Sequence, residues 1–197
     1  MGGLDLTANV VCKPCNEGWM SDIESKYAQP AMEALIIGGK TDFTISKARA
    51  KAIALFAFKT AVVIDHMGGD PPFFRRSLRY AFAAKQIIPP DVQMWFAGFL
   101  PMASGRIDTD YREASISQSR RLKLYVCTYL VGHFVFQVVC ARYCAIPSFS
   151  PKEGFEHLAV PFWPRLPKNV RWPPADVIRT PTDIVRFSER WRVLGFR

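Results

Sequence analysis

Acidic residues, histidines and cysteines are all few in this chain of 197 residues. Asp and Glu total 17 against 26 Lys and Arg, which gives a formal net charge of +9 at pH 7. A positive excess of this size favours nucleic acid or another polyanion as the partner. The five cysteines are an odd number without the spacing of a secreted disulfide scaffold, so we expect free thiols in a reducing cytoplasm. The first residues lack the basic start and apolar run of a signal peptide.

Long runs free of polar residues are also missing. The most apolar stretch, residues 124–146, contains His133, Gln137 and Arg142, and its Val, Phe and Tyr content suits buried strands. We therefore expect no membrane span. Hydrophobic residues make up 49% and charged residues 22%, which is a globular composition that excludes a disordered chain.

The first half of the chain has helical patterns. Helices are expected at residues 16–37, in one piece or in two that meet at Pro30, at 47–66 and at 72–86. Ser46 is the expected N-cap of the second helix, and Gly68 and Gly69 are expected to end it. The centre of this helix is apolar nearly all round, which predicts a position in the middle of a core.

The second half changes character after Pro89 and Pro90. Strands are expected at residues 92–100, 106–117, 121–130 and 133–143, as an antiparallel meander. The region from Pro147 is rich in Pro and Trp, and we expect it to cross the sheet as extended backbone before a last helix at 182–193.

A short cysteine motif stands near the start of the chain. Cys12 and Cys15 are separated by two residues, and Asn16 follows at the beginning of the first expected helix. Two thiolates at this spacing on a tight turn can bind one zinc ion from the same side. A tetrahedral structural zinc needs four ligands, so this turn supplies half of them.

This motif carries a family resemblance. The stretch Cys12-x-x-Cys15-Asn16-x-Gly18-Trp19-Met20-Ser21-x-x-Glu24 resembles the end of the motif in prokaryotic HNH endonuclease-type proteins. Residues 58–65, 162–164 and 172–174 resemble later parts of the same group. The resemblance implies that Cys12 and Cys15 are half of a structural zinc site. It also implies that Asn16 is a catalytic residue that faces a divalent metal such as magnesium.

The resemblance further implies an upstream Cys pair and an upstream His that acts as general base. The eleven residues before Cys12 contain neither, and all three histidines follow it. We therefore expect no catalysis by these residues alone, and DNA cleavage only where a partner chain or an upstream segment completes the site. Cys140 and Cys144 are the candidates for further zinc ligands within the chain. The alternative is a zinc-free turn packed by Trp19.

These features define an α+β fold with two parts. Residues 1–40 form an HNH-like knuckle and helix, and residues 41–197 form an α+β domain. That domain holds helices within 46–86, antiparallel strands within 92–143 and a Pro- and Trp-rich tail from 147 to 197.

Basic side chains indicate where nucleic acid binds. Arg75, Arg76 and Arg79 form the best cluster on a predicted helix, and Arg75 and Arg79 lie one turn apart, which suits adjacent phosphates. The C-terminal region adds Arg171, Arg186 and Arg190, with tryptophans nearby for base stacking. The alternative is an ordinary charged face above core aromatics.

For the other residues that could carry chemistry, we expect ordinary structural positions. We expect the amine of Lys59 to reach a carboxylate or solvent from within its apolar helix. Asp65 with His66, and Glu156 with His157, are expected on the solvated surface, and Cys127 in the core. The leading hypothesis is a nucleic-acid-binding protein of HNH type. The alternative is a non-catalytic module whose sheet and Trp-Pro tail bind another protein.

Overall fold

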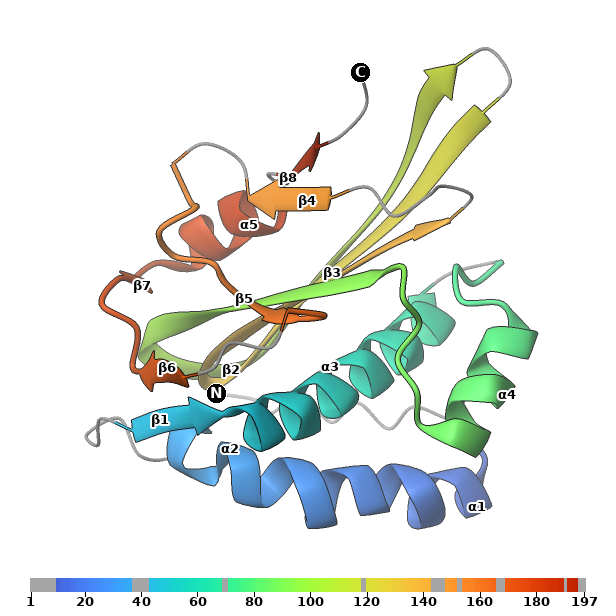
Figure 1. Ribbon diagram of the computed structural model, residues 1–197, viewed down its shortest axis with the longest axis horizontal. Helices are drawn as coiled ribbons and strands as arrows, with labels where there is room; N and C mark the ends of the chain where they lie inside the picture. Colours follow the sequence, from blue (N-terminus) through green and yellow to red (C-terminus); the bar gives the residue numbers. More distant parts are fainter. Residues whose placement is uncertain are drawn as a thin grey trace.

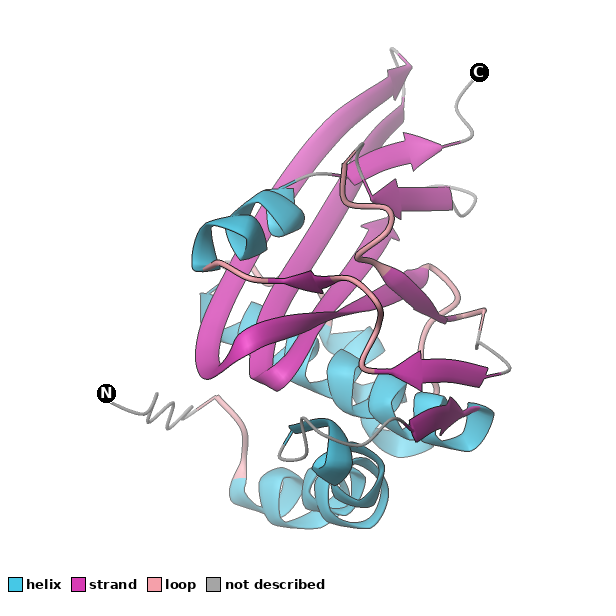
Figure 2. Cartoon of the chain, turned by 90° about the vertical axis from the view of Figure 1, so that its left-hand side faces the viewer, coloured by secondary structure: helices cyan, strands magenta, loops and turns pink. Residues whose placement is uncertain are grey.

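The computed structural model describes residues 10–36, 43–68, 71–117, 120–142, 148–151, 154–165, 169–189 and 191–194. It has helices and antiparallel sheets, as an α+β class requires (Figure 1). One helical layer covers one face of the main sheet, and a single helix lies against the other face (Figure 2). In the described residues no helix is long and apolar enough to cross a membrane.

The first helical run extends from Lys13 to Ile36. It comprises α1 (Lys13–Cys15), the π-helical segments η1 (Asn16–Met20) and η2 (Ile23–Ala28), and α2 (Gln29–Ile36). Gly18 departs from helical geometry, with φ −94° and ψ −117°. The helix expected at 16–37 is therefore present, and it begins three residues earlier than expected. Its inward side packs into the same hydrophobic cluster as the following helix.

The second helix, α3 (Lys47–Gly68), follows the short strand β1 (Phe43–Ser46) directly. The hydroxyl of Ser46 accepts a hydrogen bond from the backbone N–H of Arg49 at 3.3 Å, so the predicted N-cap is confirmed. Ala54, Ala57 and Phe58 are fully buried. The predicted central position of this helix is thus also confirmed.

The third helix, α4 (Arg76–Lys85), begins four residues later than the helix expected at 72–86. The residues ahead of it form an extended turn in which Phe73 and Phe74 are buried. Gln86 ends the helix in a left-handed conformation, with φ 51°.

Two long strands form most of the main sheet. β2 (Val92–Ser117) and β3 (Arg120–Arg142) pair as one antiparallel hairpin, in register from Val92 with Cys140 to Ser117 with Arg120. The expected meander of four strands is therefore wrong. Register shifts between Gly98 and Ala103, and between Ser104 and Ile107, occur where a chain reversal was expected. A bulge adds residues to one strand and bends it without reversing the chain, so two expected strands become one.

The Pro- and Trp-rich region adds short strands, which pair with the main sheet or form two small sheets. β5 (Val160–Trp163) pairs antiparallel with β2, and β7 (Val177–Ile178) pairs parallel with it. β6 (Asn169–Trp172) pairs with β1, and β4 (Ser148–Pro151) pairs with β8 (Trp191–Leu194). The last helix, α5 (Pro181–Glu189), is shorter than the expected 182–193, because residues 191–194 are a strand.

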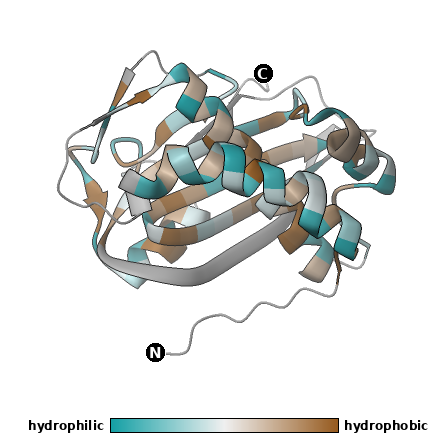
Figure 3. Cartoon of the chain, turned by 90° about the horizontal axis from the view of Figure 1, so that it is seen from below, coloured by the Kyte–Doolittle hydropathy of each residue, from teal (hydrophilic) through white to brown (hydrophobic). Residues whose placement is uncertain are grey.

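The sheet separates two hydrophobic clusters. Phe58, Phe96 and Phe134 belong to the larger cluster, which joins the helical layer to one face. Trp95, Ile184 and Phe187 belong to the smaller cluster, where α5 covers the other face. Figure 3 shows the helical layer from below, with most of the hydrophilic residues on its outer side and mainly hydrophobic strands behind it.

Candidate functional site

A tight turn at the start of the first helix brings the two cysteines together. The carbonyl oxygen of Cys12 accepts hydrogen bonds from the backbone N–H groups of Cys15 and Asn16, both at 3.0 Å. The two sulfur atoms lie 2.8 Å apart, as free thiols. Cys12 is exposed, and Cys15 is partly covered. The two cysteines thus lie side by side on a tight turn.

The two thiols differ in acidity. The pKa of Cys12 is lowered, chiefly because its thiolate accepts a hydrogen bond from the thiol of Cys15. The pKa of Cys15 is raised, first by that same hydrogen bond and then by burial. The indole N–H of Trp19 lowers the pKa of Cys15 slightly, because it interacts with the Cys15 sulfur. This interaction does not have the geometry of an ordinary hydrogen bond. Cys12 is therefore the thiol that ionises first.

The zinc site expected at this turn needs further ligands close to Cys12 and Cys15. Within the described residues, no group of three or more His, Cys, Asp or Glu side chains converges as metal ligands require. Cys140 is buried elsewhere, with its sulfur 3.7 Å from a carboxylate oxygen of Asp91. The interpretation that Cys140 completes the site is therefore not supported by its position, and Cys144 lies outside the described residues. Two thiolates on one tetrahedral zinc, with Zn–S bonds of about 2.3 Å, lie about 3.8 Å apart. The sulfur atoms of Cys12 and Cys15, at 2.8 Å, would have to separate to bind one zinc ion together.

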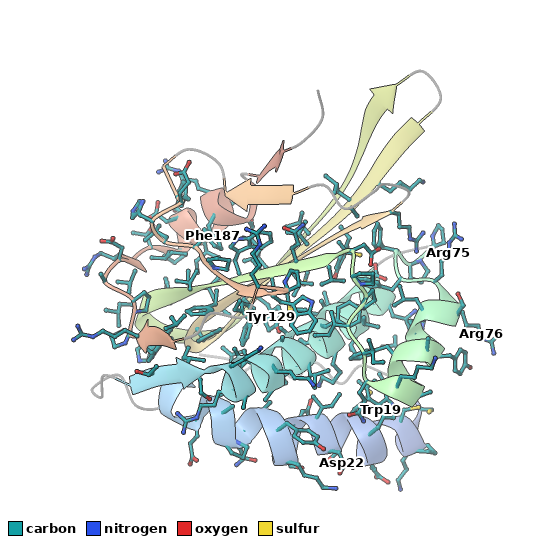
Figure 4. The ribbon with its side chains drawn as sticks, in the orientation of Figure 1. Trp19, Asp22, Arg75, Arg76, Tyr129 and Phe187 are labelled. Carbon is teal, nitrogen blue, oxygen red and sulfur yellow. The ribbon has the colours of Figure 1, made fainter. Side chains whose placement is uncertain are left out.

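A cavity of about 320 Å³ lies beside this turn. The first helix, α3 and α4 line it, and its apolar wall is formed by Met20, Val62, Val63, Phe82 and Ala83. Trp19 also lines the cavity, and its indole meets the Phe82 ring at right angles with 5.6 Å between ring centroids. Figure 4 shows Trp19 between the first helix and α4, and Asp22 toward the outer side of the same helix.

Basic side chains form the rim of the cavity. Arg79 Nη1 and His66 Nδ1 are 2.6 Å apart. Because a guanidinium can only donate, His66 Nδ1 accepts this bond and is unprotonated. Arg76 donates to the hydroxyl of Tyr80 at 3.2 Å and lies 5.3 Å from the centre of the Tyr80 ring. Tyr80 is 61% exposed, so this pair is presented to solvent.

Lys59 also lines the cavity, and its charge is compensated by a carboxylate that does not line the cavity. Its amine is paired with Glu24 and lies 5.1 Å from the centre of the Phe56 ring. The lysine side chain is 7% exposed, and the glutamate side chain is 51% exposed. The expectation that this amine reaches a carboxylate is confirmed. No Asp or Glu is among the described residues that line the cavity.

A buried carboxylate positions α4 against the other two helices. Asp65 is fully buried near the end of α3, and its two oxygens accept the backbone N–H groups of Phe73 at 2.9 Å and Phe74 at 2.8 Å. The expectation of a solvated Asp65 is therefore wrong. Asp65 is buried because two consecutive backbone N–H donors, which are enclosed by aromatic rings, need an acceptor. Glu156 and His157, by contrast, are exposed as expected.

The other predicted site residues are distributed over the molecule. Asn16 is exposed and does not line the cavity. Arg75 immediately precedes α4. The pKa of Arg142 is lowered first by the burial of Arg142 and then by the positive charge of Arg75. Arg171 lies on β6, and Arg186 lies on α5, where it faces Asp183 at 3.6 Å. Both elements are at the opposite end of the molecule from α4 (Figure 1). Arg190 lies outside the described residues.

Sequence reasoning missed Tyr80 and undervalued Trp19 and His66 as parts of one site. The four-residue spacing of Arg76 and Tyr80 on a helix was the available signal. The cavity itself had no local signal, because residues 12–19, 59–66 and 76–83 meet only in the folded chain. Comparisons of the chain with protein-family models, with curated proteins and with solved structures found no match.

Proposed function

We propose that this chain is a nucleic-acid-binding protein of the HNH endonuclease type, with DNA as its favoured partner. In this proposal the cysteine turn and the rim residues Arg76, Arg79 and His66 contact the phosphate backbone. The observation that carries it is their position around one cavity with no carboxylate among its described lining residues. The net charge of +9 supports the same partner.

Catalysis enters the proposal only for a completed assembly. Cys12 and Cys15 would contribute two ligands to a structural zinc, with the other two from a partner chain, a second copy or a further segment. Asn16 and a divalent metal such as magnesium would act in cleavage only there. The free thiols are consistent with a reducing cytoplasm, where we place the protein.

The first experiment measures DNA binding by fluorescence anisotropy at several salt concentrations. The variant Arg76→Gln with Arg79→Gln removes two rim charges. The charge-matched control, Lys51→Gln with Arg165→Gln, removes two exposed charges that do not line the cavity. Each lost phosphate contact lowers the slope of log affinity against log salt by about 1, so the rim variant should lose about 2. The control should keep the slope within about 0.5 of the wild type, because scattered surface charges contact no phosphate.

Two outcomes contradict the proposal. Equal slopes for the rim variant and the control would remove the rim from the binding surface. No DNA binding at low salt, together with a stable complex with another protein, would favour the non-catalytic interaction module. Elemental analysis of the intact protein, compared with Cys12→Ser and Cys15→Ser, tests the zinc. One zinc per chain that is lost in both variants is the expected result.

A further inference from the structure

The cavity beside the cysteine turn combines two kinds of surface that a duplex backbone does not need together. Its wall is apolar and partly aromatic, with Met20, Val62, Val63 and Phe82. Its rim carries guanidinium groups. A phosphate alone would use the rim and leave the apolar wall exposed to water. An uncharged apolar ligand would use the wall and leave the cations without a partner.

The wall also contains a hydrogen-bond donor that is only weakly used. Trp19 Nε1 is buried without a hydrogen bond of ordinary geometry among the described residues, and its N–H acts weakly on the sulfur of Cys15. An indole N–H can only donate, so a better acceptor can replace this weak interaction. His66 has a second donor, since its Nδ1 accepts from Arg79 and its proton is therefore on Nε2. A fitting ligand brings acceptor atoms on an otherwise apolar body.

One chemical class has all these properties. A nucleotide has a planar base with ring-nitrogen and carbonyl acceptors, joined to a phosphate. The cavity volume of about 320 Å³ is at the lower end of the range of about 300–1,000 Å³ for small-molecule sites. That volume accommodates one base with its sugar.

We infer that this cavity holds one unpaired nucleotide of a bound strand, with its base against Trp19 and its phosphate at Arg76 and Arg79. This inference rests on the proposed nucleic-acid binding and adds a preference for unpaired bases. Tyr80, beside Arg76 at the rim, offers an exposed ring for the neighbouring base. Fully paired DNA would contact the rim alone.

The test compares two probes that differ in one nucleotide. One is a short blunt duplex, and the other is the same duplex with a single unpaired 2-aminopurine nucleotide in its middle. Stacking of one base on aromatic side chains changes affinity by roughly 5- to 150-fold. We expect the bulged duplex to bind about 10-fold more tightly, and its 2-aminopurine fluorescence to fall on binding as the base stacks.

A matched pair of variants assigns that preference to the cavity. Ala83→Leu fills the cavity, because Ala83 is half-buried in its wall. Ala84→Leu makes the same change at the next residue of α4, which is exposed and does not line the cavity. The 10-fold preference should be lost in the first variant and kept in the second. The preference is the ratio of the two affinities measured for the same variant, so a general change in DNA affinity does not affect it. Ala84→Leu should also keep the wild-type affinity for the blunt duplex.

The possible failures are distinguishable. If wild-type protein binds both probes equally, without a fall in 2-aminopurine fluorescence, the inference is overturned while the proposed DNA binding stands. Survival of the preference in Ala83→Leu would also overturn it. Displacement of the bulged duplex by an equal concentration of free nucleoside monophosphate would assign the cavity to a free nucleotide instead. If neither duplex binds, the proposed function fails and the inference fails with it. The fluorescence arm needs no variant, so the test does not depend on the folding of Ala83→Leu.

Discussion

Replacing Asp65 by Asn tests how α4, and with it the rim of the cavity, is held in place. The carboxylate accepts two backbone N–H groups, from Phe73 at 2.9 Å and from Phe74 at 2.8 Å. Asn has nearly the same shape, so the change creates no cavity. Its carbonyl oxygen can accept one of the two N–H groups, and its amide NH₂ then faces the other donor.

The magnitude follows from these contacts. A hydrogen bond to a charged group contributes about 1.5–3 kcal/mol, against about 1 kcal/mol for a neutral one. Asp65→Asn removes one charged bond, weakens the other and leaves one buried N–H without an acceptor. We expect a loss of about 3 kcal/mol in the free energy of unfolding. For a chain of this size that corresponds to a fall of roughly 6–12 °C in Tm.

Urea unfolding measures this loss, and Asp22→Asn is the control. Asp22 makes an exposed pair with Lys26 at 2.8 Å within one helix, so its replacement should cost less than about 0.5 kcal/mol. The DNA affinity of Asp65→Asn should fall as well, because α4 carries Arg76 and Arg79. A cost below about 1 kcal/mol for Asp65→Asn, or a cost equal to that of the control, would refute the account of Asp65.

Three further predictions concern buried or paired groups. Glu24→Gln leaves the charge of the buried Lys59 amine without a carboxylate partner and should cost about 2 kcal/mol in urea unfolding, whereas Lys59→Met should cost less than about 1 kcal/mol; equal costs would contradict the pairing. Tyr129→Phe should stabilise the protein by up to about 1 kcal/mol at pH 7, since the buried hydroxyl makes no hydrogen bond of ordinary geometry and interacts only weakly with Thr60. Burial raises the pKa of Tyr129 well above its usual value, so the wild type should lose stability as pH rises above about 10 and the variant should lose less; a destabilised variant at pH 7 would refute this. In metal-free protein, iodoacetamide should modify Cys12 before Cys15 near neutral pH, and Cys15→Ala should slow modification of Cys12 because it removes the hydrogen bond that lowers its pKa. Mass spectrometry of the modified peptides measures both rates, and an unchanged rate would contradict that cause.

Local patterns predicted the helices because their signals are local. The nearly continuous apolar centre of α3 and the Ser46 cap both lie within the helix itself or beside it. The strand segments were also recognisable, but their connection was not. Gly105 and Gly132 mark a bend or a turn equally well, and only cross-strand register decides between the two.

The candidate site was predictable in parts. The motif at Cys12 and Cys15 and the cluster containing Arg76 and Arg79 were each visible in the sequence. Their position around one cavity was not, because it depends on the turn that Asp65 holds. An acidic residue close to a glycine pair has the pattern of a surface turn. Its burial follows from aromatic side chains eight and nine residues later, a relation that no periodic pattern expresses.

The pairing of β1 with β6 has a consequence for synthesis of the chain. Ser46 lies opposite Asn169, and Phe43 lies opposite Trp172. The Trp172 ring is stacked on Phe134 with 5.0 Å between centroids, and it is almost fully buried. A nascent chain on the ribosome therefore exposes Phe134 and an unpaired β1 until residue 172 has emerged. Until then it presents the kind of apolar surface that chaperones bind.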